Sequence, residues 1–202
     1  MTLVTVIPGS FTASGLPSLG VKGFADTFTR PDAASLGDTE GMPRRSWSVW
    51  TQSGTFAHGV TNGEGYAYRS DTAGHTLATV DAEAADGTLE LTMGTRGASA
   101  QHGAVFRATD IGNYYRLVDA QGAEYRLQRF IGGAVTLLGA AAGVTPAAGD
   151  VLRIVLDGPS IAVHINGVQR ITASDTHNQV ATRHGFYNNA QGSTIRDISF
   201  TV

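Results

Sequence analysis

The chain has 202 residues, of which 26 are glycine and only 15% are charged, and its formal net charge is −3. This length suits one sizeable β-sandwich, and the abundance of glycine favours short strands and tight turns over long helices. The small negative charge gives no reason to expect nucleic-acid or membrane binding, and the absence of cysteine excludes disulfides and thiolate metal sites.

Residues 1–23 differ in character from the rest of the chain. They have no basic region and no apolar run long enough for a signal peptide, so we expect no export by the general secretory route. Proline and glycine interrupt the segment and prevent one continuous strand or helix. We expect an arm that docks on a neighbour, either a second copy or another protein, or on the domain itself, with a simple edge strand as the alternative. The docking side chains would be Leu3, Val6, Ile7, Phe11 and Leu16.

A first strand is expected just after this arm. The sequence from Phe24 to Asp32 reads Phe-Ala-Asp-Thr-Phe-Thr-Arg-Pro-Asp, and Leu36-Gly37 and Trp47 follow. We interpret Phe24 and Phe28 as core anchors. The pattern resembles the opening of jelly-roll modules in actinobacterial proteins and in tail or decoration proteins of their phages. The resemblance implies a single domain over residues 24–202.

The middle of the chain contains short β-branched and aromatic runs at intervals of about 8 to 12 residues, which is typical of a sandwich. Turns are indicated at 52–54, 62–65, 110–113 and 120–122, and Asp86-Gly87 indicates a hairpin. The predicted strands cover residues 46–51, 55–60, 66–69, 77–80, 89–93, 104–107, 114–118, 125–130 and 135–138.

Residues 149–173 predict a three-stranded meander. Runs at 151–156, 161–165 and 168–172 are separated by Asp157-Gly158-Pro159 and by Asn166-Gly167, which suits a two-residue type I′ turn. A strict register would place Arg170 opposite Val163, so Arg170 lies either at a rim or at a bulge. A last strand is expected at 193–200.

The meander resembles the late strands of concanavalin A-like, or laminin G-like, jelly rolls. It carries the pattern Gly-Asp-x-Leu-x-Ile, a short turn, and then Ile-x-Val-x-x-Asn-Gly. We therefore expect an all-β fold, a concanavalin A-like jelly-roll β-sandwich of two antiparallel sheets with an N-terminal arm. The boundary between arm and domain is placed between residues 23 and 24.

Catalysis is considered because the resemblance includes retaining glycanases, which need two carboxylates roughly 5 Å apart. The candidates are Asp81 with Glu83, which share a strand face, and Glu90 alone. The first two lead into a turn, where solvated acidic residues are common. The Glu-x-Asp-x-x-Glu signature of glycanases with this fold is missing. We therefore expect no catalytic residues and no enzyme activity.

Metal binding has few candidates. The six histidines are scattered, with no pair at i, i+2 or i+4. Resemblance to laminin G-like modules implies that Asp175, His177 and Asn178 can assemble around Ca²⁺, and Asp26 with Asp197 is a second pair, since the first and last strands lie close together. A turn or strand-end hydrogen bond is the alternative role for each. We expect no cofactor.

Aromatic rings and arginine forks on a concave sheet face would suit sugars or acidic polymers. The alternative is core aromatics with surface arginines. Trp47 and Trp50 have opposite parity, so one should be core and the other exposed or interfacial. The ligand-binding candidates are Trp50, Arg107, Tyr115, Arg126 and Tyr187, with Arg116, Tyr125 and Arg129 nearby.

The leading functional hypothesis is a non-catalytic virion structural protein of a bacteriophage, in the minor tail, the tail tip or the capsid decoration. It would be made in the host cytoplasm and located in the virion. Its partners would be other virion proteins or a second copy, and host surface carbohydrate is a candidate ligand. A carbohydrate-binding module of a cellular protein and a glycoside hydrolase are the alternatives.

Overall fold

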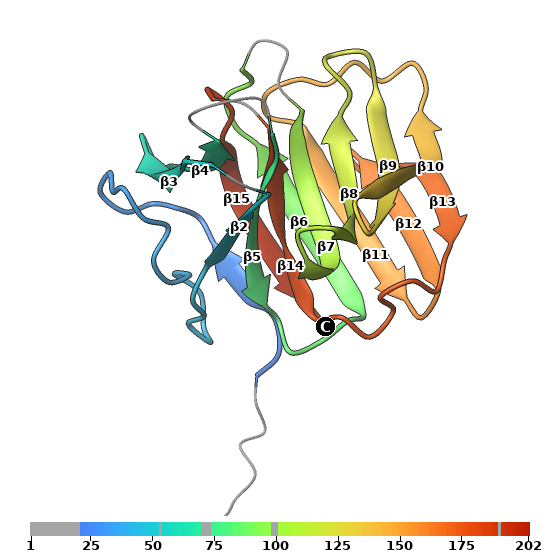
Figure 1. Cartoon of the computed structure of the whole chain (residues 1–202), viewed down its shortest axis with the longest axis horizontal. Helices are drawn as coiled ribbons and strands as arrows, with labels where there is room; N and C mark the ends of the chain where they lie inside the picture. Colours follow the sequence, from blue (N-terminus) through green and yellow to red (C-terminus); the bar gives the residue numbers. More distant parts are fainter. Residues whose placement is uncertain (1–20, 53, 70–73, 98–100, 190) are drawn as a thin grey trace, which may run out of the picture.

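The computed structural model describes residues 21–52, 54–69, 74–97, 101–189 and 191–202. These residues form fifteen strands in two antiparallel sheets and contain no helix (Figure 1). Accordingly, no helix in this part of the chain is long and apolar enough to cross a membrane. The expected all-β sandwich of two antiparallel sheets is confirmed.

The eight-stranded sheet carries most of the C-terminal strands. Its order is β13 (Val168–Ser174), β12 (Ser160–Ile165), β11 (Val151–Asp157), β6 (Gly87–Met93), β15 (Ile195–Thr201), β4 (Glu64–Arg69) and β3 (Phe56–Thr61). The eighth strand, β1 (Phe24–Asp26), pairs with β15.

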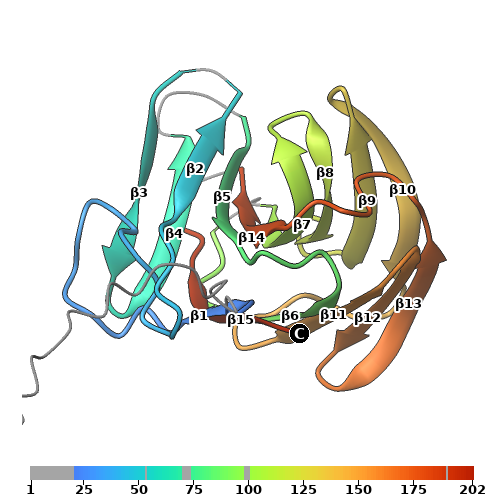
Figure 2. The ribbon, with the colours of Figure 1, turned by 90° about the horizontal axis from the view of Figure 1, so that it is seen from below.

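The seven-stranded sheet lies against it. Its order is β10 (Ala134–Ala141), β9 (Tyr125–Ile131), β8 (Asn113–Asp119), β7 (His102–Asp110), β14 (Arg183–Asn188), β5 (Thr76–Asp81) and β2 (Ser48–Thr51). Figure 2 shows that this sheet curves, so that β2 and β10 rise at its two ends and its outer face is concave.

The core follows from strand alternation. On β6, Leu89 and Leu91 are fully buried while Glu90 between them faces solvent, as the sequence predicted. On β8, Tyr115 and Leu117 point inward in the same way. Each large apolar side chain buried here contributes roughly 1.5 to 3 kcal/mol relative to exposure, so the inner faces supply the main driving force for sandwich formation.

The predicted hairpin at Asp86-Gly87 is wrong. The strands β2 and β3 lie in different sheets, and so do β5 and β6. Between β5 and β6 the chain crosses from one sheet to the other through Ala82 and Ala84, which are both buried. Asp86-Gly87 predicts that the chain changes direction. It does not distinguish a hairpin from a crossover between sheets, because both connections need the same backbone freedom.

Strand β14 was not predicted. Its sequence shows no alternation, because it lies in the middle of the sheet and nearly all of its residues are buried. Gly185 sits so close to β5 that a Cβ there would lie 1.9 Å from the carbonyl oxygen of Ala78. Phe28 is fully buried, as expected of a core anchor, but it follows β1 with a φ of 53° instead of continuing the strand.

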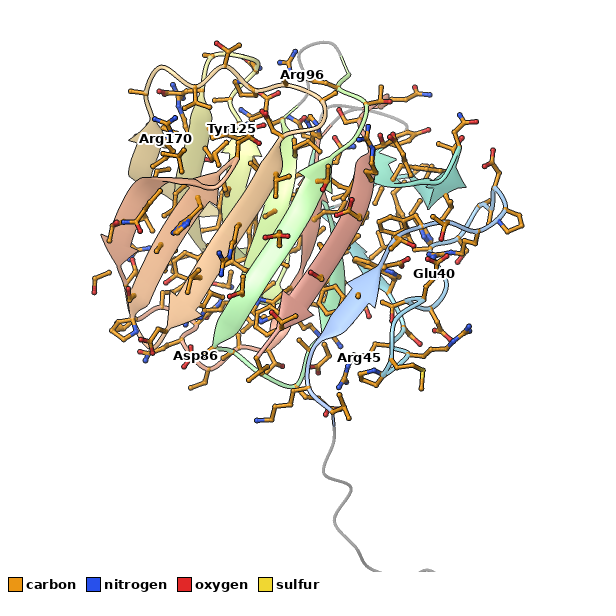
Figure 3. All side chains as sticks on the ribbon, turned by 180° about the vertical axis from the view of Figure 1, so that it is seen from behind. Glu40, Arg45, Asp86, Arg96, Tyr125 and Arg170 are labelled. Atoms are coloured by element: carbon orange, nitrogen blue, oxygen red, sulfur yellow. The ribbon has the colours of Figure 1, made fainter. Side chains whose placement is uncertain are left out.

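The Asn-Gly turn between β12 and β13 has the expected positive φ angles, 51° at Asn166 and 77° at Gly167. The Asn166 side chain accepts a hydrogen bond from the Val151 amide at 2.9 Å and donates one to Asp150 at 2.9 Å. Asp150 also accepts from the hydroxyl of Tyr125, on the other sheet, at 2.7 Å. The turn is therefore linked to both sheets at one end of the sandwich, where Figure 3 shows Tyr125.

The register of β12 and β13 shifts by one residue between Val163 and His164. Val163 pairs with Ile171 and His164 with Gln169, so Arg170 is the extra residue. Its side chain is exposed on the outside of β13 (Figure 3). Of the two alternatives that the sequence left open, the structure selects the bulge, which keeps Val163 and Ile171 in the core.

Arg45 anchors the beginning of the described chain. Its guanidinium donates hydrogen bonds to the carbonyls of Gly23 and Val21, both at 2.8 Å, and pairs with Glu83 at 2.9 Å. The predicted boundary between residues 23 and 24 stays a prediction. The arm side chains Leu3, Val6, Ile7, Phe11 and Leu16 lie outside the described residues.

The two Asn-Gly turns allow the contribution of the Asn166 side chain to be isolated. Asn62 has a φ of 50°, but its side chain makes no hydrogen bond within the described part of the chain. We expect Asn166→Ala to lower the free energy of unfolding by about 2 to 3 kcal/mol, from backbone strain and two lost hydrogen bonds, and Asn62→Ala by only about 1 kcal/mol. Urea denaturation measures both, and equal losses would contradict the linking role of Asn166.

Two buried histidines make stability depend on pH. Burial lowers the pKa of His184, whose ring stacks on Phe200, to about 4, and burial likewise lowers the pKa of His102 to about 4. In the unfolded chain these histidines bind protons below about pH 6.5, whereas in the folded chain they stay neutral down to about pH 4. Their contribution to the free energy of unfolding is therefore fully present above about pH 6.5 and is lost as the pH falls towards about 4.

We expect the free energy of unfolding to fall by about 1 to 2 kcal/mol per histidine between about pH 7.5 and about pH 5. In His102→Met, urea titrations should show this fall reduced by about half, since one of the two groups is gone. A wild-type protein that is equally stable at both pH values would refute the prediction.

Candidate functional site

The outer, concave face of the seven-stranded sheet carries a second cluster of packed side chains. Strand alternation places them there, because their neighbours Tyr115, Leu117 and Leu127 point into the core. The cluster comprises Leu77, Val105, Ala108, Tyr114, Val118, Phe130 and Tyr187, with Trp50 and Ile111 packed against it.

Arg116 occupies the centre of this face. Its guanidinium carbon lies 4.6 Å from the ring centre of Phe130 and 4.3 Å from that of Tyr187, so the cation is held between two aromatic rings. Its Nε donates a hydrogen bond to Gln128 at 2.8 Å. The residue is only 7% exposed. The aromatic rings and the Gln128 carbonyl together replace the water that this buried cation has lost.

Tyr114 continues the aromatic layer, and its ring stacks on Phe130 at 4.5 Å with an interplanar angle of 8°. The His75 ring stacks on Tyr187 at 5.9 Å. Burial raises the pKa values of Tyr114 and Tyr187, which keeps both phenols neutral. The centre of the concave face is therefore filled by the protein's own side chains.

The margin of the same face is open. Beside Trp50, on the edge strand β2, lies a cavity of about 530 Å³. Arg183 lies over the Trp50 ring at 5.5 Å. Asp110 is held in place by the Gly112 amide at 2.7 Å and the Asn113 side chain at 2.9 Å. The described lining is Val49, Trp50, Thr51, Thr109, Asp110 and Ile111, and we call it the Trp50 cavity.

The candidate carboxylates are engaged elsewhere. Asp81 accepts a hydrogen bond from Thr182 at 2.7 Å, and although burial raises its pKa, this bond and the Glu83 amide lower it overall. The ion pair with Arg45 lowers the pKa of Glu83. A general acid needs a raised pKa, so this pair is poorly suited to acid catalysis. Glu90 lies on the outside of the other sheet.

The oxygens proposed for Ca²⁺ are also occupied by donors. Asp175 accepts hydrogen bonds from the Tyr115 hydroxyl at 2.7 Å and the His177 amide at 2.9 Å, and it pairs with Arg129. Asp26 accepts hydrogen bonds from the side chains of Arg30 and Trp47 and from the Phe28 amide. Asp197 accepts one from the Thr92 hydroxyl. Among the described residues, no group of three or more histidines and carboxylates is arranged to hold a metal ion.

The predicted ligand-binding residues fall into two groups. Trp50, Tyr187 and Arg126 face outward on the seven-stranded sheet, where Tyr187 is 2% exposed and Arg126 pairs with Glu124 at 2.9 Å. Arg107 and Tyr115 do not face it. Tyr115 points into the core, and Arg107 is fully buried against Asp86 and the Gly158 carbonyl, both at 2.7 Å (Figure 3 labels Asp86).

A bulge explains the position of Arg107. The register of β7 against β8 shifts between Phe106 and Asp110, and Arg107 itself has a φ of 47°. The alternation of inward and outward side chains along β7 is therefore interrupted at Arg107. Sequence reasoning also missed Asp110 and Ile111 as cavity residues, because it interpreted residues 110–113 only as a turn. The available signal was Ile111, an apolar side chain within an otherwise polar turn.

The two tryptophans take the roles that their parity indicated. Trp47 packs in the core, with its ring 5.3 Å from that of Phe186 and 6.0 Å from that of Phe24. Trp50 faces the opposite side, towards the concave surface.

No family model and no curated protein matches the sequence. Solved structures that share its fold include the following three. A carbohydrate-binding module from Bacillus subtilis has a TM-score of 0.55 and 19% identity over 77% of this chain and 95% of that chain. A β-glucanase from Bacillus licheniformis has a TM-score of 0.58 and 12% identity, covering 90% and 98%. A protein of unknown function with a galectin-like fold from B. subtilis has a TM-score of 0.57 and 14% identity over 76% of this chain and 88% of that chain. At these identities the similarity shows the jelly-roll fold.

The packing of Arg116 can be tested against a surface arginine of the same sheet. We expect Arg116→Ala to lower the free energy of unfolding by about 2 to 3 kcal/mol, because two cation–π contacts and a buried hydrogen bond are lost. Arg126→Ala, which removes an ion pair whose arginine side chain is 43% exposed, should cost under about 1 kcal/mol. Urea denaturation measures the free energy of unfolding of both variants, and equal losses in the two would contradict the packing assigned to Arg116.

Proposed function

We propose that this protein is a non-catalytic carbohydrate-binding protein whose ligand contacts the Trp50 cavity. The observation that carries the proposal is the half-buried Trp50 ring at the margin of the concave face, beside a carboxylate and two threonines. A tryptophan ring packs against the apolar C–H face of a sugar, while Asp110, Thr51 and Thr109 can bond its hydroxyl groups. The cavity volume of about 530 Å³ lies in the usual range for small-molecule sites.

The binding chemistry follows from how these groups are held. Asp110 accepts hydrogen bonds from a backbone amide and from Asn113, which fix its orientation before a ligand arrives. A carboxylate that accepts from a sugar hydroxyl forms a charge-assisted hydrogen bond, which is stronger than a neutral one. Trp50 supplies apolar contact area without much loss of side-chain freedom. The fold supports the proposal in general terms, since a carbohydrate-binding module shares it at 19% identity.

The absence of catalysis is part of the proposal. A retaining glycosidase needs two carboxyl groups roughly 5 Å apart. Among the described residues that line the Trp50 cavity, Asp110 is the one carboxylate. On the central strand β7, the outward positions that precede it are occupied by Gly103, Val105 and Ala108. These side chains cannot transfer a proton or attack a glycosidic bond.

The place of the protein in a virion stays a prediction from the sequence. It depends on the arm, residues 1–23, and most of this arm lies outside the described residues. Contact with other virion proteins, self-association and assembly in the host cytoplasm stay predictions for the same reason. A phage particle and a cellular carbohydrate-binding protein would both use the cavity described above, so the binding proposal applies to either.

Affinity electrophoresis through gels that contain a neutral or an acidic polysaccharide tests the proposal. We expect Trp50→Ala to lower the affinity measured from the retardation about tenfold. Trp50→Phe should retain most of the affinity, because an aromatic face remains. Arg170→Ala, an exposed bulge residue far along the other sheet, is the control and should behave as wild type.

The same polysaccharides should release no reducing ends on incubation with the protein. Equal retardation of wild type and Trp50→Ala would contradict the proposed site. Hydrolysis that disappears in Glu83→Gln or Glu90→Gln would contradict the absence of catalysis.

A further inference from the structure

A second group of aromatic side chains lies on the other sheet, on strand β4. Gly65 and Ala67 face the core, where a Cβ on Gly65 would lie 2.6 Å from the Phe28 ring. Tyr66 and Tyr68 must therefore point outward from the eight-stranded sheet. Their ring centres are 5.7 Å apart, at an angle of 33°. Figure 1 shows β4 beside β15, near one edge of this sheet.

These two rings line a cavity of about 310 Å³. Both tyrosines are half-buried, and neither hydroxyl is hydrogen-bonded to another residue in the described part of the chain. The cavity is completed by hydroxyl and amide groups from β3 and from the loop before β15. Its described lining is Thr61, Tyr66, Tyr68, Gln191, Gly192, Ser193 and Thr194, and we call it the tyrosine cavity.

The loop that forms one wall is firmly attached. The Ser193 hydroxyl accepts a hydrogen bond from the Gly97 amide at 3.0 Å, and the Ser193 carbonyl accepts one from Asn188 at 3.2 Å. The Thr194 amide donates to the Thr95 carbonyl at 3.0 Å. A wall that is already ordered loses little freedom on binding, so the cavity is prepared for a ligand.

Glu64, on the same face of β4 as the tyrosines, sets the charge beneath the cavity. It accepts hydrogen bonds from the Thr194 hydroxyl and from the amide of Thr95, and it lies 3.7 Å from Arg196. Although burial raises its pKa, these hydrogen bonds lower it overall. Its charge is thus committed to holding the wall and is offset by Arg196. Among the described residues that line the cavity, none carries a charge.

We propose that the tyrosine cavity is a second carbohydrate-binding site, and that it takes neutral sugar units. Two phenol rings offer apolar surface to the C–H face of a sugar. The two phenol hydroxyls, the Gln191 amide and Thr61 supply uncharged donors and acceptors for its hydroxyl groups. This inference rests on the proposed function, but it uses a different sheet, and the described linings of the two cavities share no residue.

Two sites on one domain would make binding to a polymer bivalent. Once one site holds a polysaccharide chain, the second meets a high local concentration of the same sugar. A long polysaccharide should therefore bind more tightly than a tetrasaccharide of the same composition, and loss of either cavity should remove this advantage. A tetrasaccharide binds each cavity separately.

Amide NMR titration with neutral tetrasaccharides of glucose, mannose, xylose and galactose separates the two sites. We expect shifts in residues 61–68 and 191–194 as well as in residues 49–51 and 109–111. The double variant Tyr66→Ala/Tyr68→Ala should lose the first set with about a tenfold loss of affinity there, and Trp50→Ala should lose the second. Tyr66→Phe/Tyr68→Phe should retain the stacking but bind more weakly, and it guards against misfolding of the alanine variant.

The outcomes distinguish the two proposals. Shifts confined to the Trp50 cavity, with unchanged affinity in both tyrosine double variants, overturn the second site and leave the proposed function standing. Shifts confined to the tyrosine cavity support the second site and overturn the Trp50 location. Absence of binding to every sugar overturns both. A lower molecular mass of the tyrosine variants in light scattering would mean that the rings contact a second copy, which also overturns the second site.

Discussion

The position of Arg116 between Phe130 and Tyr187 determines what the concave face can do. A buried cation is costly unless aromatic faces and hydrogen bonds replace its water, and here both are supplied from neighbouring strands. The rings that hold the arginine are therefore unavailable to a ligand. Any ligand of this face must approach from the margin, where Trp50 stands on an edge strand.

The Trp50 cavity and the tyrosine cavity share a design despite lying on different sheets. Each combines aromatic rings on a strand near a sheet edge with a short connection between two other strands. In each, a carboxylate stabilises that connection: Asp110 accepts a hydrogen bond from the amide of Gly112, and Glu64 accepts one from the hydroxyl of Thr194. The strands fix the rings and the loops supply polar groups, an arrangement in which loop sequence can change without altering the sandwich.

Much of the fold could be predicted from the sequence, because short-range patterns determine it. Alternation in β6 and the Asn-Gly turn at Asn166 gave the correct strands and the correct outward faces. Tertiary position decided the rest. Strand β14 is buried on both faces and so has no alternating pattern. The candidate site was predicted in part: Trp50 was identified, but the bulge at Arg107 and the inward direction of Tyr115 depend on pairing partners distant in the chain.

The pairing of β1 with β15 places the two ends of the sandwich side by side, since Phe24 lies opposite Phe200. Arg45 then fixes the direction in which the chain enters, through the carbonyls of Val21 and Gly23. A domain with adjacent ends can be inserted into a surface loop of another protein without stretching the host. By the same geometry, its ends can be joined by a short linker and new ends opened elsewhere. Val180, 86% exposed in the connection between β13 and β14, marks a suitable place for such a circular permutation.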